Sequence, residues 1–89
     1  MSVPITIELY GIARARAGRS EFAIQAATPH EALVRLAEAC PSIGDVCQGD
    51  GRLAPQYLLS LDGRQFILNL TKPLHAGDRL LLLSADAGG

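Results

Sequence analysis

Four side chains could bind a metal ion or serve as nucleophile and base: the cysteines Cys40 and Cys47 and the histidines His30 and His75. Their order along the chain fits none of the compact spacings of zinc modules. Neither histidine has a nucleophile at a recognisable spacing, and no serine or cysteine lies in a nucleophile-elbow pattern. We therefore expect no metal site and no catalytic side-chain cluster, and we expect the cysteines to be reduced, buried thiols.

The end of the chain is the remaining candidate for chemistry. The sequence ends Ser84-Ala85-Asp86-Ala87-Gly88-Gly89. A terminal Gly-Gly pair arises by chance in roughly 0.5% of chains at ordinary glycine usage, so by itself it is also compatible with a frayed end. A free α-carboxylate has a pKa of about 3.5, is ionised at pH 7 and needs activation before it can react as an electrophile.

The composition of the chain limits the class of protein that carries this tail. The chain has 89 residues, 48% hydrophobic and 19% charged, with a formal net charge of −1. That is enough for one compact core and argues against a disordered chain. The absence of a basic excess argues against binding to nucleic acid or to a membrane surface. No apolar run reaches the roughly 18 residues of a membrane helix, and the start lacks signal-peptide features, so we expect a cytoplasmic protein.

Two segments near the N-terminus, 5–10 and 21–25, alternate between apolar and polar residues with period 2. This alternation predicts two half-buried strands. Their inward positions are Ile5, Ile7, Leu9, Phe22 and Ile24. We expect an antiparallel hairpin whose strands are joined by a loop between Gly11 and Gly18.

The clearest local signal is the helix start Thr28-Pro29-His30-Glu31. Thr28 can cap the first backbone donors, Pro29 suits the first helical position and Glu31 completes a capping box. Apolar residues follow at helical spacing on one face: Leu33, Leu36, Ala37 and Cys40. Pro41 ends this helix. A shorter helical turn is expected at 42–47, with Ile43, Val46 and Cys47 on one side.

Three more strands are predicted at 57–61, 65–68 and 79–83, punctuated by the turns Asp62-Gly63 and Gly77-Asp78. The resulting order indicates an α+β domain in which one helix packs across one mixed sheet.

Period 2 in the last strand sends alternate leucines to opposite faces. If Leu80 and Leu82 face the helix, Leu81 and Leu83 face outward, beside Leu58. Several apolar side chains on one exposed face next to a functional tail would form a docking patch. The alternative is that another loop or a second copy covers them.

Together these features resemble the MoaD/ThiS family of ubiquitin-like sulfur-carrier proteins, over essentially the whole chain. The shared points include the helix start at Thr28, the segments Leu59-Ser60-Leu61-Asp62-Gly63 and Leu74-His75-Ala76-Gly77-Asp78, and the terminal Gly88-Gly89. The long segment 41–56 is closer to the branch of the molybdopterin-synthase small subunit. The family often has Val-Asn-Gly where Leu61-Asp62-Gly63 stands, and prolines where Ser84-Ala85 stands.

The resemblance implies a β-grasp domain at 1–84, with four to five strands on one main helix, and a flexible tail at 85–89. An E1-like adenylating enzyme would join the Gly89 carboxylate to AMP, and a persulfide donor would convert it to a thiocarboxylate. Gly88 and Gly89 would be the reacting end, because glycines can thread a narrow channel. The partner-binding residues would be Leu58, Leu81, Leu83, Ala85, Asp86 and Ala87. The carrier would bind no cofactor and would deliver sulfur to a synthase.

Three other roles stay open. The protein could be the small, non-catalytic subunit of molybdopterin synthase, working inside a complex with the large subunit. It could be a protein modifier whose terminus joins a target lysine. It could also be a β-grasp interaction module in which Gly88-Gly89 is incidental.

Overall fold

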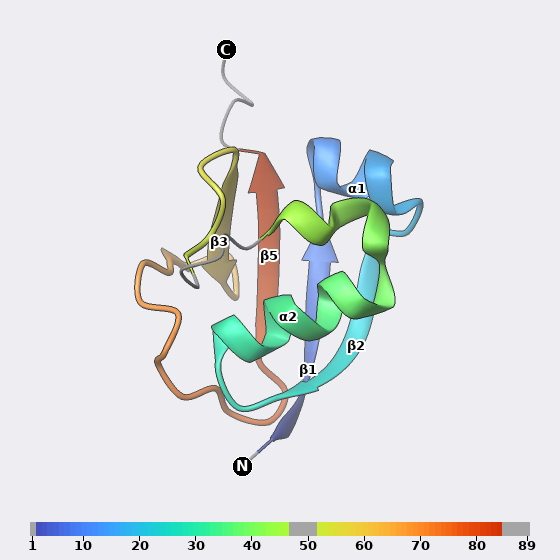
Figure 1. The fold of residues 1–89 in the computed structure, drawn as a ribbon. Coiled ribbons are helices and arrows are strands. Elements are labelled where there is room, and N and C mark those ends of the chain that lie inside the picture. Colours follow the sequence, from blue (N-terminus) through green and yellow to red (C-terminus); the bar gives the residue numbers. More distant parts are fainter. Residues whose placement is uncertain (1, 47–51, 85–89) are drawn as a thin grey trace.

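The computed structural model describes residues 2–46 and 52–84. Within them a mixed sheet of five strands has the order β2-β1-β5-β3-β4 (Figure 1). The strands are β1 (Val3–Leu9), β2 (Glu21–Ala26), β3 (Tyr57–Leu61), β4 (Gln65–Phe66) and β5 (Arg79–Ser84). The pair β1–β5 is parallel, whereas β1–β2, β3–β4 and β3–β5 are antiparallel. The predicted N-terminal hairpin and mixed sheet are confirmed, and β5 is the central strand.

One helix, α2 (Pro29–Ala39), crosses one face of the sheet (Figure 1). Its Leu33 and Leu36 are fully buried, as are Leu80 and Leu82 of β5. The inward positions predicted for β1 and β2 are also buried. The predicted register of β5 is therefore confirmed, and its even-numbered leucines belong to the core.

The start of α2 agrees with the predicted cap except in one detail. The Thr28 hydroxyl accepts a hydrogen bond from the Glu31 backbone N–H at 3.2 Å, and Pro29 occupies the first turn. The Glu31 carboxylate accepts from the backbone N–H of Ala27 at 2.6 Å, one residue before the donor that a capping box uses. The helix ends before Pro41, as predicted.

The predicted short turn is the 3₁₀ segment η1 (Pro41–Val46). Ile43 and Val46 are fully buried, as predicted. Cys47 lies outside the described residues.

The expected loop between Gly11 and Gly18 is wrong, because this segment forms a second helix, α1 (Gly11–Ala17). Alanine and arginine fill most of it, and both favour helix. Ala13 is fully buried, so contacts with the rest of the fold add to this preference. Gly18 ends the helix in the left-handed region, at a φ of 75°, and its N–H bonds to the Arg14 carbonyl.

The fourth strand is shorter than the predicted 65–68 and covers only Gln65–Phe66. The Ile67 N–H still bonds to the Leu59 carbonyl at 2.8 Å, but pairing with β3 then stops. The Asn69 side chain accepts hydrogen bonds from both the N–H and the hydroxyl of Thr71. The Leu70 carbonyl accepts from the His30 N–H at the start of α2. These bonds turn the chain away from the sheet edge.

None of the helices in the described parts of the chain is long and apolar enough to cross a membrane.

Candidate functional site

The candidate reacting end follows β5, whose last residue is Ser84. Ala85, Asp86, Ala87, Gly88 and Gly89 lie outside the described residues, so their predicted roles stay predictions. What the structure does show is how the point from which they extend is held.

Ser84 is buried, with 6% of its surface exposed, and contacts on both sides hold it in place. On one side it pairs with Tyr57 of β3. On the other side its hydroxyl accepts a hydrogen bond at 3.1 Å from the backbone N–H of Ile12, in the first turn of α1. Two residues earlier, the Leu82 carbonyl accepts from the Tyr10 N–H at 3.0 Å. The end of β5 is thus bonded to the start of α1, and α1 sits at the same end of the sheet (Figure 1).

The predicted leucine patch lies on the sheet face opposite α2, and the strand register brings its members together. Leu83 pairs with Leu58, which is 40% exposed. Leu81 pairs with Ser60, and Ser60 pairs in turn with Phe66, which is 63% exposed. Leu81 and Leu83 are half-buried. We refer to Leu58, Phe66, Leu81 and Leu83 as the outer-face patch.

Phe66 was not among the residues predicted for this patch. The hairpin turn at Asp62-Gly63 could have identified it, because the turn sets which residues of β3 and β4 lie opposite each other. The patch continues into a hollow of about 420 Å³ whose lining includes Leu58, Phe66 and Leu68. Leu68 is 95% exposed. Of the leucines for which a covering loop or a second copy was considered, Leu58 is left exposed by residues 2–46 and 52–84, whereas Leu81 and Leu83 are half-buried.

A polar boundary runs along one side of the outer-face patch. On this face Glu8 of β1 pairs with Leu81. The Glu8 carboxylate accepts hydrogen bonds from the Tyr10 hydroxyl and the Arg79 guanidinium. The bond to Glu8 raises the pKa of Tyr10. An apolar centre with a polar rim is the usual organisation of a protein-binding surface.

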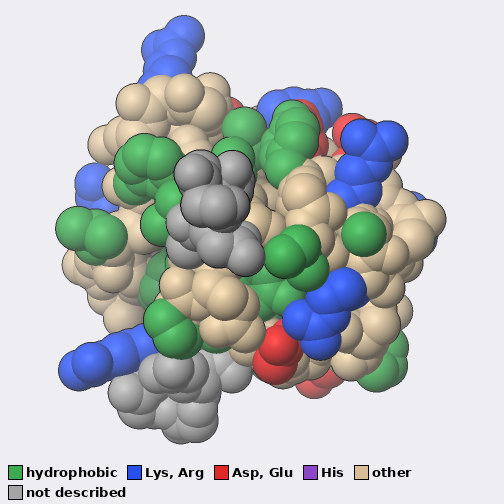
Figure 2. Space-filling model, turned by 90° about the horizontal axis from the view of Figure 1, so that it is seen from above, with side chains coloured by type: hydrophobic (Ala, Val, Ile, Leu, Met, Phe, Trp, Pro, Cys, Tyr) green, Lys and Arg blue, Asp and Glu red, His purple; other side chains and the backbone are tan. Residues whose placement is uncertain are grey.

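Figure 2 views the molecule from the end at which β5 stops. Apolar side chains form several separate areas on this end, with basic side chains between them. Acidic side chains are also visible at this end, so its surface carries charges of both signs beside the apolar areas.

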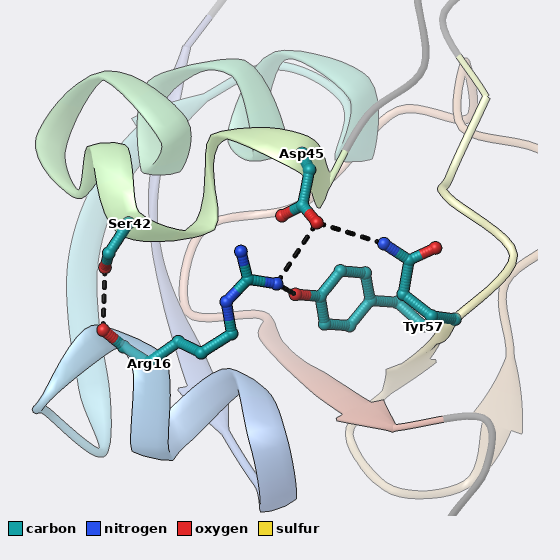
Figure 3. Close-up of polar contacts among 5 residues, drawn as sticks. Arg16, Ser42, Asp45 and Tyr57 are labelled. Atoms are coloured by element: carbon teal, nitrogen blue, oxygen red, sulfur yellow. Dashed lines mark hydrogen bonds and ion pairs between the residues drawn. The ribbon is translucent and has the colours of Figure 1, made fainter.

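A polar cluster braces η1 against α1 and β3 (Figure 3). The Arg16 guanidinium donates to the Asp45 carboxylate at 3.1 Å and to the Tyr57 hydroxyl at 3.0 Å. The same Asp45 oxygen accepts from the Gln56 side chain, and the Ser42 hydroxyl donates to the Arg16 carbonyl at 2.7 Å. Burial, followed by the Asp45 charge, raises the pKa of Tyr57. The polar groups of this cluster bond to one another and hold three elements together, so we assign the cluster a structural role.

Of the four histidines and cysteines, His30, Cys40 and His75 lie in the described residues and Cys47 does not. His30 lies in the first turn of α2, whereas the His75 side chain is 88% exposed, 3.9 Å from the Asp78 carboxylate. Cys40 is a buried free thiol next to the Ser42 hydroxyl. Within residues 2–46 and 52–84, no group of three or more His, Cys, Asp or Glu side chains could hold a metal ion.

Comparison with known proteins places this architecture among the ubiquitin-like β-grasp folds. The chain superimposes on the crystal structure of SAMP1 from Haloferax volcanii with a TM-score of 0.82 and 26% identity, over 97% of this chain and 99% of that one. It also resembles the Amycolatopsis orientalis BexX/CysO complex, with a TM-score of 0.79 and 20% identity over 96% and 99% of the two chains. Urm1 from Trypanosoma brucei gives a TM-score of 0.65 and 19% identity over 99% and 97%.

No protein-family model matches the chain. No curated protein matches it by sequence. The structural neighbours nevertheless confirm the predicted α+β β-grasp fold and the resemblance to ubiquitin-like carriers of the MoaD/ThiS type. They do not single out the molybdopterin branch.

Proposed function

We propose that this protein is a sulfur carrier whose Gly89 alternates between a carboxylate and a thiocarboxylate. The observation that carries the proposal is the β-grasp fold whose central strand, β5, is followed at once by Ala85-Asp86-Ala87-Gly88-Gly89. The structural neighbours support a carrier or modifier rather than an enzyme. The cytoplasm, where thiols stay reduced, is the compartment in which we place this chemistry.

The proposed cycle has three steps. The Gly89 carboxylate attacks the α-phosphate of ATP on an E1-like adenylating enzyme, and pyrophosphate leaves. The terminal sulfur of a persulfide attacks the acyl carbon, and AMP leaves with the electron pair of the broken C–O bond. A second thiol then attacks the inner sulfur of the acyl disulfide, forms a disulfide with the donor and releases the thiocarboxylate. A sulfur-accepting synthase consumes this product, and the large molybdopterin-synthase subunit is one candidate.

In this proposal the folded domain is the part that partners recognise. The outer-face patch would dock on the activating enzyme and on the synthase, with Glu8 and Arg79 at its rim. Ala85, Asp86 and Ala87 would lie in the partner's channel. From Ala85 onward the chain spans at most about 17 Å, at ~3.4 Å per residue, so the terminus can enter an active site while the domain stays outside. A neighbouring fold, CysO, forms a complex with BexX, which supports partnership with a larger protein.

Intact-mass spectrometry tests the proposal directly. After incubation with ATP, the cognate activating enzyme and a persulfide donor, the protein should gain the mass difference between one sulfur and one oxygen atom. A control without ATP should show no gain, because the free carboxylate is a poor electrophile. A fully active enzyme mixture that leaves the mass unchanged would contradict the carrier role, and the interaction-module alternative would then be favoured.

A protein-modifier role is the second candidate, favoured by the similarity to SAMP1, whose name is small archaeal modifier protein 1. In that role the acyl-adenylate, directly or through an enzyme thioester, would be attacked by a lysine amine to give an isopeptide bond. This chain contains a single lysine, Lys72, which is exposed. Lys72 lies in the segment before β5, at the end of that strand opposite Ser84.

We therefore expect any lysine-linked self-conjugate to carry its bond at Lys72. With a conjugating mixture, Lys72→Arg should abolish the isopeptide-linked dimer, because arginine keeps the charge but cannot serve as the acceptor amine. Monomer thiocarboxylate formation should be unchanged and serves as the control. Peptide mapping of the dimer checks the site, and an isopeptide-linked dimer of the Lys72→Arg protein would contradict this prediction.

A further inference from the structure

The start of α1 lacks a cap of its own. Tyr10 occupies the N-cap position, and its side chain makes no capping hydrogen bond. The first turn of a helix leaves backbone N–H groups without partners inside the helix. The Ile12 N–H finds its acceptor 72 residues away, in the Ser84 hydroxyl. We call this hydrogen bond the Ser84 cap.

The Ser84 cap depends on a close approach between the two chain segments. Gly11 has a φ of +60°, and a Cβ at this position would lie 3.0 Å from the Ser84 Oγ. Glycine therefore satisfies both the backbone angle and the space. The cap is built from the last residue of the central strand and the first turn of a helix that the sequence did not predict.

The Ser84 cap changes where the tail effectively begins. With it, β5 is held through Ser84 by Tyr57 on one side and by α1 on the other. Without it, the last bond from β5 to this side of the fold is the one from the Tyr10 N–H to the Leu82 carbonyl. Leu83 and Ser84 would then keep only their pairing with β3. Held on one side alone, the end of the strand could change direction more easily, so the terminus would point along the activating channel in a smaller fraction of docked complexes.

We propose that Ser84 is a positioning residue that, by capping α1, sets the point and direction from which the terminal carboxylate is presented to the activating enzyme. This inference rests on the proposed carrier function and adds a residue to it. Ser84 would act through its hydrogen bond to the backbone of α1 and would touch no reacting atom. Its effect should therefore appear in the efficiency of tail presentation and not in domain docking.

Three variants separate positioning from general stability. Ser84→Ala removes the hydroxyl, Ser84→Thr keeps it and suits a strand, and Ile24→Val removes a buried methyl group on β2 as the control for lost stability. Amide hydrogen exchange of Ile12, with Leu82 as an internal reference for global opening, reports the cap without any enzyme. The rate of pyrophosphate release reports how well the tail is presented to the activating enzyme. It is measured at saturating ATP while the carrier concentration is varied, at a temperature well below the melting temperature of every variant.

We expect Ser84→Ala to speed exchange at Ile12 about tenfold relative to Leu82, since a lost cap opens the first turn locally. We expect kcat for pyrophosphate release to fall about fivefold while KM changes less than about twofold, because docking persists and only alignment is lost. Ser84→Thr should restore both readouts, and Ile24→Val should change neither. If wild type is activated normally and Ser84→Ala keeps wild-type kcat and KM, this inference is overturned and the proposed function stands. If wild type is not adenylated at all, the proposed function fails and this inference fails with it.

Discussion

Deleting Gly89, or adding one residue after it, should reduce sulfur transfer at least about 100-fold while leaving thermal unfolding unchanged. Deletion moves the terminal carboxylate back by about 3.4 Å. Extension moves it forward by one residue, past the position from which it would attack ATP. Neither change touches the buried core, which the described residues from β1 to β5 supply. Pyrophosphate release and thiocarboxylate formation measure the reaction, and a thermal melt measures the fold.

One residue added before Met1 is the matched control, because it alters the length of the chain equally and leaves the reacting end intact. The variants must be confirmed by intact mass before and after the assay, so that trimming of the extension is detected. An untrimmed extended protein that transfers sulfur at the wild-type rate would exclude the terminal carboxylate as the reacting group.

Placing a glutamate on alternate residues of β5 should separate folding from docking. Leu80 and Leu82 have 0% exposure, so Leu80→Glu or Leu82→Glu buries a carboxylate among apolar side chains. We expect a loss of about 4 kcal/mol or more, which corresponds to a fall in melting temperature of at least about 15 °C for a domain of this size. A domain this small has only a few kcal/mol in reserve, so extensive unfolding is also an expected result.

The odd-numbered leucines should behave differently, because Leu81 and Leu83 are half-buried in the outer-face patch. Leu81→Glu or Leu83→Glu should leave the domain folded and weaken binding to the activating enzyme about tenfold or more, since docking would desolvate the charge. Val34→Glu on the exposed side of α2, where Val34 is 38% exposed, is the control for a new surface charge. Unchanged binding of folded Leu81→Glu and Leu83→Glu proteins would show that the outer-face patch is not the docking surface.

Local patterns in the sequence were sufficient wherever a residue's environment follows from its neighbours along the chain. Period-2 alternation identified the inward residues of β1 and β2, because a strand with one buried face must alternate. The four consecutive leucines of β5 do not alternate, so the burial of Leu80 and Leu82 in the folded chain decides its register. Thr28, Pro29 and Pro41 set the limits of α2 through local hydrogen bonding and sterics. The resemblance to ubiquitin-like carriers depended on this order of elements together with Gly88-Gly89, and the structural neighbours bear it out at the level of the fold.

Tertiary structure decided the features whose partners lie far away in the sequence. The α1 segment is too short to be a stable helix by itself, and it forms where Ala13 is buried and Ser84 supplies a cap from the other end of the chain. The parallel pairing of β1 with β5 makes β5 central, and cross-strand register brings Phe66 into line with Ser60 and Leu81. Sequence alone therefore determined the limits of α2 and the buried faces of α2, β1 and β2, since those depend on local periodicity and capping. The outer-face patch and the bond between Ser84 and α1 required the folded chain, since hydrogen bonds and register between distant segments create them.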